Sequence, residues 1–292
     1  MYRALVLVAH VLAALTIACE QGEAESAATP AGDVPVRVVS LAPSLTEVVL
    51  ALGAADTLVG VDRYSAELEG APPARVLGDL FSPDLEGLIE LDPSLVIGVE
   101  SVAHGRLVAW LRRQGTPVET FRLHSLAEVL GGFDRLGRLL SRHAAGAALA
   151  ARVRAQLDEI ADSVRGRPRP RVALVIQRDP LIVVGAGSFA SDLLEFAGGD
   201  NIFRDLRDAY PRVSLEALAA RHPDIVLETS APGEEARAAV RRYWAEFSFV
   251  GRADSVERGS VVLPGAHLVD GALRLRRLVH PDLDLSQRGL GR

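Results

Sequence analysis

The chain has 292 residues, of which 49% are apolar and 24% charged, and its formal net charge is −6 at pH 7. This length accommodates two ordinary domains, and the composition is that of a globular protein rather than a disordered one. All 32 basic residues are arginine and they form no dense run, so the chain lacks the positive stripe that nucleic-acid binding requires. Nucleic acid is therefore not an expected partner.

The first residues have the pattern of an export signal. Arg3 precedes a mainly apolar run over residues 4–18, which is shorter than the roughly 20 residues that a membrane-spanning helix needs. Cys19 ends the run, and residues 16–19 resemble the bacterial lipobox, in which the cysteine is lipidated. Thr16 departs from the usual leucine of that motif. We predict a lipoprotein-type signal peptide over residues 1–19, with a plain secretory signal as the alternative.

Two further observations concern this segment. Cys19 is the only cysteine of the chain, so it has no disulfide partner within the chain and a lipid is its more natural partner. Residues 20–35 are rich in small and polar residues and carry too little apolar surface to fold. We predict that they form a flexible tether, which would hold the folded part near a bacterial membrane at a periplasmic or cell-surface location.

From Val36 onward, apolar strand-like runs alternate with amphipathic helical stretches, which indicates parallel α/β structure. This first lobe is predicted to span residues 36–142. Its expected strands are residues 36–41, 58–61, 95–99 and 117–121, and its expected helices are residues 46–52, 85–91, 104–114 and 126–140.

Residues 144–164 form the longest uninterrupted helical pattern, with an apolar stripe at spacings of three and four. The helix would extend about 30 Å at 1.5 Å per residue, so we predict that residues 143–166 connect two lobes and limit the opening between them. Residues 167–292 form the second lobe, beginning with a strand at 171–177. The predicted fold class is α/β, with two Rossmann-like lobes, each around a central mostly parallel sheet, joined by one long helix.

An internal repeat supports the two lobes. The segment from Asp84 to Pro93 and the segment from Ser214 to Pro223 match at a constant offset of 130 positions, each with an N-cap residue, a leucine, a first-turn glutamate and a proline stop. Residues 44–53 and 188–198 are a looser echo. Within the first of these, Ser44 and Glu47 stand at capping-box spacing, and Gly53 is an expected helix stop.

Glu86 and Glu216 occupy matched positions in the repeat. First-turn glutamates are favoured by the helix dipole without any partner, which explains either residue alone. Two carboxylates at corresponding points of two lobes can instead meet two arginine sites on a two-fold symmetric partner. The pair therefore suggests docking to a dimer.

A glycine-rich turn offers a competing function. Gly185, Gly187 and Ala190 follow an apolar run and open a helix, which matches the loose form of the dinucleotide fingerprint. An extracytoplasmic dinucleotide-dependent oxidoreductase is the corresponding alternative. The acidic candidates Asp205 and Asp208 follow no strand, so we interpret the segment as a strand-to-helix turn that lines a cleft.

Few other residues suggest chemistry. The histidines form no metal-binding pattern, and no nucleophile elbow is present; only His267, in a loop-like segment, is a candidate site histidine. Tyr64 and Tyr210 stand in polar loops where an aromatic ring can cover a ligand, and Phe81 is a weaker candidate of the same kind. The alternative for each tyrosine is packing, half-buried, on its own lobe.

Residues 37–47, 58–61 and 85–97 resemble the helical-backbone solute-binding proteins, and the resemblance extends from Val36 to about Leu283. It implies two lobes joined by a long helix and a ligand between them, cobalamin or a related corrinoid, with haem or an iron-siderophore as alternatives. It also implies docking of Glu86 and Glu216 on arginines of the membrane subunits of an ABC importer. The residues that it implies for ligand binding are Tyr64, Tyr210, Gly265, Ala266, His267 and Leu268, and Phe81 is added to this predicted set as the weaker aromatic candidate.

Three positions depart from the family pattern, because Leu80, Val99 and Val183 stand where large aromatic residues are expected. The aromatic cradle is accordingly thinner than that of a cobalamin binder. We predict an exported, lipid-anchored, monomeric binding protein that delivers a metal-chelate ligand to a permease. We expect no catalysis, no cofactor and no metal site of its own.

Overall fold

A computed structural model of the chain describes residues 36–79 and 82–283. The described residues belong to one compact unit that begins at Val36. The predicted signal peptide, including Cys19, and the predicted tether lie outside the described residues.

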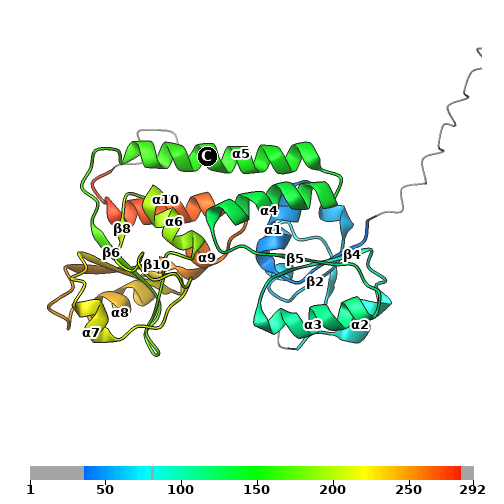
Figure 1. Cartoon of the computed structure of the whole chain (residues 1–292), viewed down its shortest axis with the longest axis horizontal. Helices are drawn as coiled ribbons and strands as arrows, with labels where there is room; N and C mark the ends of the chain where they lie inside the picture. The colour runs from blue at the N-terminus through cyan, green and yellow to red at the C-terminus, as the bar shows by residue number, and fades with distance from the viewer. Residues whose placement is uncertain (1–35, 80–81, 284–292) are drawn as a thin grey trace, which may run out of the picture. The chain divides into compact units, whose positions relative to one another are not determined.

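The first lobe contains a five-stranded, all-parallel sheet with strand order β3-β2-β1-β4-β5. Helices α1 (Pro43–Ala51) and α4 (Leu126–Leu139) lie on one side of this sheet, and α2 (Leu85–Glu90) and α3 (Val102–Arg113) lie on the other (Figure 1). Two short 3-10 turns, Ala55–Thr57 and Ser65–Glu67, flank β2. The strands are β1 (Val38–Ser40), β2 (Leu58–Val61), β3 (Arg75–Val76), β4 (Leu95–Val99) and β5 (Val118–Phe121).

The second lobe contains a sheet of order β10-β9-β6-β7, to which β8 adds by pairing with β6. Only the β6–β7 pairing is antiparallel among the described pairings of this sheet. The strands are β6 (Arg171–Gln177), β7 (Ile182–Val183), β8 (Asp200–Asn201), β9 (Ile225–Ser230) and β10 (Arg252–Glu257). The helices are α6 (Phe189–Phe196), α7 (Leu215–Ala219), α8 (Glu234–Trp244), α9 (Arg258–Val262) and α10 (Leu268–Val279).

Helix α5 (His143–Ser163) joins the two lobes and is 21 residues long. Its predicted apolar stripe, from Leu149 to Ile160, is buried, and the helix packs against α4, α6 and α10. The crossing with α4 is close: a Cβ added to Gly137 would lie 2.9 Å from the Cα of Gly146. The predicted fold class, two α/β lobes joined by one long helix, is confirmed.

One apolar cluster extends beneath α5 from one lobe to the other. It includes Val38 and Phe133 of the first lobe, Leu157 of α5, and Leu193 and Leu275 of the second lobe. Each sheet has a separate, smaller cluster on its other face. Because the central cluster contains residues of both lobes, opening the lobes widely would expose buried apolar surface.

Of the helix caps predicted at Asp84, Ser214 and Ser44, the first two are present in the structure. Asp84 accepts a hydrogen bond from the Gly87 N–H at 2.8 Å, and Ser214 accepts one from the Ala217 N–H at 3.2 Å. The capping box predicted for Ser44 and Glu47 is wrong. Helix α1 begins earlier, with Pro43 in its first turn and Ala42 as N-cap, because the fixed φ of proline suits the first helical position.

The carboxylate of Glu47 instead reaches the second lobe, where it accepts hydrogen bonds from the backbone N–H groups of Ala266 and His267. Burial raises the pKa of Glu47, and the His267 charge and the two N–H groups oppose that rise. Asp192 of α6 makes the converse contact, since its Oδ2 accepts from the N–H of Leu126, the first residue of α4, at 2.7 Å. Burial also raises the pKa of Asp192.

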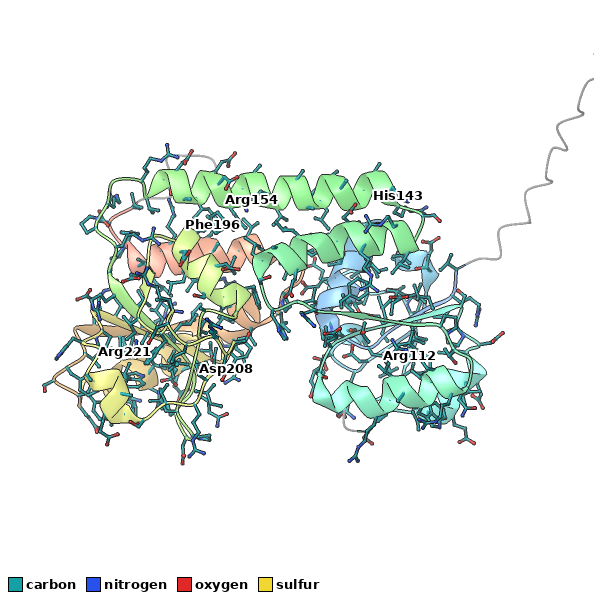
Figure 2. All side chains as sticks on the ribbon, in the orientation of Figure 1. Arg112, His143, Arg154, Phe196, Asp208 and Arg221 are labelled. Atoms are coloured by element: carbon teal, nitrogen blue, oxygen red, sulfur yellow. The ribbon has the colours of Figure 1, made fainter. Side chains whose placement is uncertain are left out.

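These two carboxylates occupy matched places, because counting back from the stop residues Gly53 and Gly198 puts Glu47 and Asp192 at the same helical position of the looser repeat. Each lobe thus provides a carboxylate that accepts hydrogen bonds from backbone N–H groups at the start of a helix in the other lobe. A third inter-element contact lies nearby: the guanidinium of Arg154, on α5, sits 5.4 Å from the ring centroid of Phe196, on α6 (Figure 2).

We predict that Asp192→Ala lowers the free energy of unfolding by about 1–2 kcal/mol, because the Leu126 N–H loses its acceptor. Asp192→Asn should cost less than about 0.5 kcal/mol, since an amide oxygen can accept the same hydrogen bond. Urea unfolding of both variants measures the difference. Equal losses in the two variants would show that this hydrogen bond does not stabilise the contact between the lobes.

Candidate functional site

The carboxyl ends of the strands form the candidate site in each lobe. In open α/β sheets, ligands bind outside the carboxyl ends of the strands, where loops rather than ladder hydrogen bonds present the side chains. In the first lobe, Tyr64 follows β2, Glu100 follows β4, and Arg122 and His124 follow β5. We call this set of strand ends, in either lobe, the carboxyl edge.

Tyr64 projects from the carboxyl edge on a rigid turn. The carboxylate of Asp62 accepts hydrogen bonds from the N–H groups of Tyr64, at 2.9 Å, and Ser65, at 3.2 Å. The hydroxyl of Ser65 continues this buried network to Asp62 and Thr46. The Tyr64 side chain itself is 59% exposed, so it does not pack half-buried on its own lobe.

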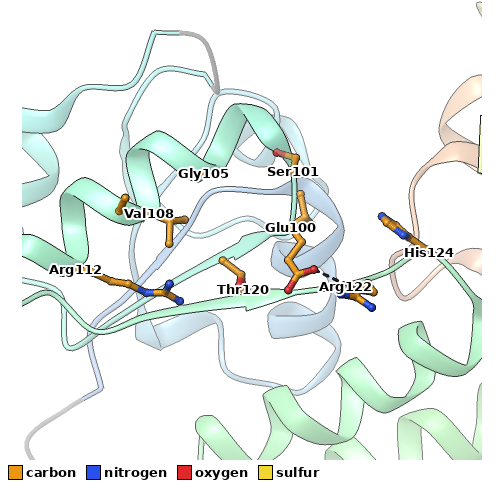
Figure 3. Close-up of a pocket in the computed structure, with 10 residues that line it drawn as sticks. Glu100, Ser101, Gly105, Val108, Arg112, Thr120, Arg122 and His124 are labelled. Atoms are coloured by element: carbon orange, nitrogen blue, oxygen red, sulfur yellow. Dashed lines mark hydrogen bonds and ion pairs between the residues drawn. The ribbon is translucent and has the colours of Figure 1, made fainter.

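A cavity of about 560 Å³ opens beside β4 and β5 (Figure 3). Val99 and Val108 contribute an apolar wall, and the polar residues include Glu100, Arg122 and His124. The Arg122 Nε donates to Glu100 Oε2 at 3.2 Å. Val99, one of the positions where an aromatic residue was expected, therefore leaves open space at this edge.

His124 is held by its backbone at the junction of the lobes. Its N–H donates to Glu128 Oε2 at 3.0 Å, and its carbonyl accepts from the N–H of Phe189, the first residue of α6. Its imidazole remains exposed at the cavity. Arg122 and His124 were not predicted as site residues, although their place directly after the predicted strand at 117–121 was a usable signal.

In the second lobe, Tyr210 lies in a loop that packs on the glycine-rich turn. The side chain is 40% exposed, while burial of its hydroxyl end raises the pKa of Tyr210 and a hydrogen bond with Ser188 opposes that rise. The hydroxyl is thus fixed on the protein while part of the ring remains open. Val183, another of the three positions where an aromatic residue was expected, is fully buried.

Two backbone donors of the glycine-rich turn are already used within the protein. The Gly185 N–H donates to the Ala209 carbonyl at 3.0 Å, and the Ala186 N–H donates to the Leu206 carbonyl at 2.8 Å. A Cβ on Gly185 would lie 2.1 Å from the Asp208 carbonyl oxygen. Close packing on the 206–211 loop therefore accounts for these glycines, and the interpretation as a strand-to-helix turn fits the structure.

The segment from Gly265 to Leu268 packs on Glu47 of the first lobe. A Cβ on Gly265 would lie 1.9 Å from Glu47 Oε2, and Leu268 is only 1% exposed, so its side chain belongs to the core. Ala266 and His267 line a cavity of about 450 Å³ between α5 and α10. His267 is the last residue of this turn segment and the N-cap of α10, and its Nδ1 lies 3.8 Å from Asp270 Oδ2.

Glu86 and Glu216 are exposed in the first turns of α2 and α7. In each lobe this helix lies on the side of the sheet away from α5 (Figure 1). Neither glutamate forms an ion pair with another described residue. A hydrogen bond with the Ser214 hydroxyl lowers the pKa of Glu216, which keeps this carboxylate charged.

Three observations complete the site. Phe81 and Leu80 lie outside the described residues. Residues 36–79 and 82–283 contain no group of three or more His, Cys, Asp or Glu residues that could hold a metal ion. Within the same ranges, no helix is both long enough and apolar enough to cross a bilayer.

Comparison with known proteins gives a consistent result. The family model described as periplasmic binding protein matches residues 38–240. A cobalamin-binding protein of Halobacterium salinarum is 29% identical over 259 residues, covering 84% of this chain and 70% of that protein.

Two solved structures share the fold. A periplasmic haem-binding protein of Pseudomonas aeruginosa superposes with a TM-score of 0.72 at 28% identity, covering 86% of this chain and 95% of that one. The periplasmic vitamin B12-binding protein of Vibrio cholerae superposes with a TM-score of 0.71 at 22% identity, and the match covers 84% of this chain and 96% of that one. The family resemblance seen in the sequence is confirmed, and the chain belongs to the periplasmic binding protein family.

Proposed function

We propose that this chain is an extracytoplasmic substrate-binding protein of an ABC importer, and that it binds a corrinoid between its two carboxyl edges and delivers it to the membrane permease. The exposed Tyr64 ring carries this proposal: Asp62 fixes the backbone from which the ring projects, and an exposed aromatic plane suits a flat macrocyclic ligand. The relative from Halobacterium salinarum supports a corrinoid as the ligand. The proposed role is binding, without covalent chemistry.

Haem is the second candidate ligand. The haem-binding protein of Pseudomonas aeruginosa is 28% identical to this chain, close to the 29% of the cobalamin-binding relative. In addition, Arg122 and His124 place basic groups beside the open cavity. A ferric siderophore would use the same basic groups. The three ligands are therefore tested together.

We predict that Tyr64→Ala weakens binding of the true ligand about tenfold or more, which corresponds to about 1.4 kcal/mol. Its melting temperature should stay unchanged, because the ring is exposed. Calorimetry of the mature domain from Val36 with cyanocobalamin, haemin and a ferric siderophore measures both the identity of the ligand and the loss.

Ile89→Ala, which removes an exposed apolar side chain from α2, is the matched control and should bind like wild type. NADH is the probe for the competing oxidoreductase class. If Tyr64→Ala binds the ligand as tightly as wild type, the Tyr64 ring does not contact the ligand. If the protein binds NADH and none of the three chelates, it belongs to the oxidoreductase class and the proposed binding function is wrong.

We also propose that Glu86 and Glu216 dock on two basic sites of a two-fold symmetric permease. Exposed carboxylates with no ion-pair partner among the described residues can form charge-assisted hydrogen bonds with arginines without first breaking an ion pair. Their helices lie on the sides of both sheets away from α5 (Figure 1), which leaves both free for one partner.

We predict that the double variant Glu86→Arg/Glu216→Arg retains ligand affinity but loses nearly all uptake in cells, because like charges would then meet at both docking points. Glu235→Arg is the matched control, since Glu235 is also an exposed first-turn glutamate, on α8. If the double variant takes up ligand as well as the control does, the two glutamates do not dock on the permease, and the helix dipole alone accounts for their positions.

We propose, finally, that Cys19 is lipidated and anchors the protein to a bacterial membrane. The cysteine ends the apolar run and has no other cysteine to pair with. We predict that Cys19→Ser moves the protein from the membrane fraction to the soluble fraction and abolishes incorporation of labelled fatty acid, with ligand affinity unchanged. Fatty-acid labelling of the Cys19→Ser variant equal to that of wild type would contradict the anchor.

A further inference from the structure

Arg178 is held in an unusual way at the carboxyl edge of the second sheet. It follows β6, and its Nε donates to Glu228 Oε2 at 2.7 Å. Its guanidinium carbon lies 4.0 Å from the ring centroid of Tyr243, on α8. The side chain is 31% exposed, so one part of the guanidinium is packed and another part remains open.

Glu228, on β9, is only 8% exposed and is itself fixed by a second donor. The indole Nε1 of the buried Trp244 donates to the same oxygen, Oε2, at 2.7 Å. A buried carboxylate is costly unless several partners compensate for its lost hydration. Residues of β6, β9 and α8 therefore converge on the position of one guanidinium.

The terminal nitrogens of Arg178 are not used by this arrangement. Among the described residues, its only hydrogen bond is the one from Nε. A guanidinium fixed through Nε and through its stacked face still offers the donors of its terminal nitrogens, and a planar fork of this kind matches a carboxylate or a phosphate. Little side-chain entropy would be lost when such an anion binds.

We propose that Arg178 is a recognition residue for an acidic group, a carboxylate or a phosphate, carried by the ligand. This inference rests on the proposed function, because it assumes that the ligand occupies the carboxyl edges. It narrows the ligand class to metal chelates with an anionic substituent: the phosphodiester of a complete corrinoid, or the propionates of haem. Glu228, Tyr243 and Trp244 are positioning residues.

The test compares each chelate with an analogue that lacks the free acid. Cyanocobalamin is paired with dicyanocobinamide, which has no phosphodiester, and haemin is paired with haemin dimethyl ester. We expect wild type to bind the acidic member about tenfold or more tightly, as a charged hydrogen bond would give. Arg178→Gln should remove that preference and leave affinity for the analogue unchanged.

Two variants guard against a folding artefact. Arg178→Lys keeps a cation beside Glu228 but lacks the fork, so it should lose most of the preference while melting like wild type. Arg204→Gln removes an exposed arginine that pairs with Asp200 at 3.2 Å, and it should behave like wild type toward both members.

The outcomes separate the two proposals. If wild type binds both members of a pair equally, or if Arg178→Gln and Arg178→Lys keep the preference, the role of Arg178 is overturned while the binding function stands. If both variants weaken both members equally, Arg178 is structural only. If wild type binds neither cyanocobalamin nor haemin, the proposed ligand class fails and the role of Arg178 fails with it.

Discussion

The continuous apolar cluster beneath α5 is the constraint on which the arrangement of the two lobes depends. Helices α4, α6 and α10 pack against α5, and the apolar residues of these helices and of α1 belong to the same cluster. Glu47 and Asp192 then fix the polar ends of these helices across the junction. The relative position of the two carboxyl edges is thus a property of the core and does not have to be created by a ligand.

This arrangement also explains why the polar chemistry gathers where it does. The helices around α5 occupy one face of each sheet, and α2, α3, α7 and α8 cover the other (Figure 1). The strand ends are left for loops, and those loops carry Tyr64, Arg122, His124 and Arg178. In the second lobe, the glycine-rich turn donates the N–H groups of Gly185 and Ala186 to a neighbouring loop, so these two main-chain donors are not available to a ligand.

Much of the fold could be predicted from the sequence because the signals were local. The caps at Asp84 and Ser214 lie within three residues of the groups they satisfy, and the apolar stripe of α5 is periodic over several turns. Ser44 and Glu47 show the limit of such reasoning. Their spacing satisfies a local rule, yet Glu47 binds backbone N–H groups more than two hundred positions away, and no local pattern reports such a partner.

The site was harder to predict than the fold for the same reason. A tyrosine in a polar loop can be exposed or packed, and only the buried Asp62 network decides that Tyr64 is exposed. Leu268 and His267 are adjacent in sequence, but one is core and the other is exposed. The sequence around Arg178 likewise does not identify Glu228, fifty positions away, as the residue that holds it.

The matched glutamates of α2 and α7 have one further consequence. A partner with true two-fold symmetry presents identical sites to either lobe, whereas the two lobes are only similar, since Glu216 is hydrogen-bonded to Ser214 and no such contact is described for Glu86. The complex would then exist as a pair of orientations related by a half-turn. Because these two orientations are symmetry-equivalent, they have the same free energy, and in either one the two identical subunits of the partner meet different lobes, so the docked complex is asymmetric.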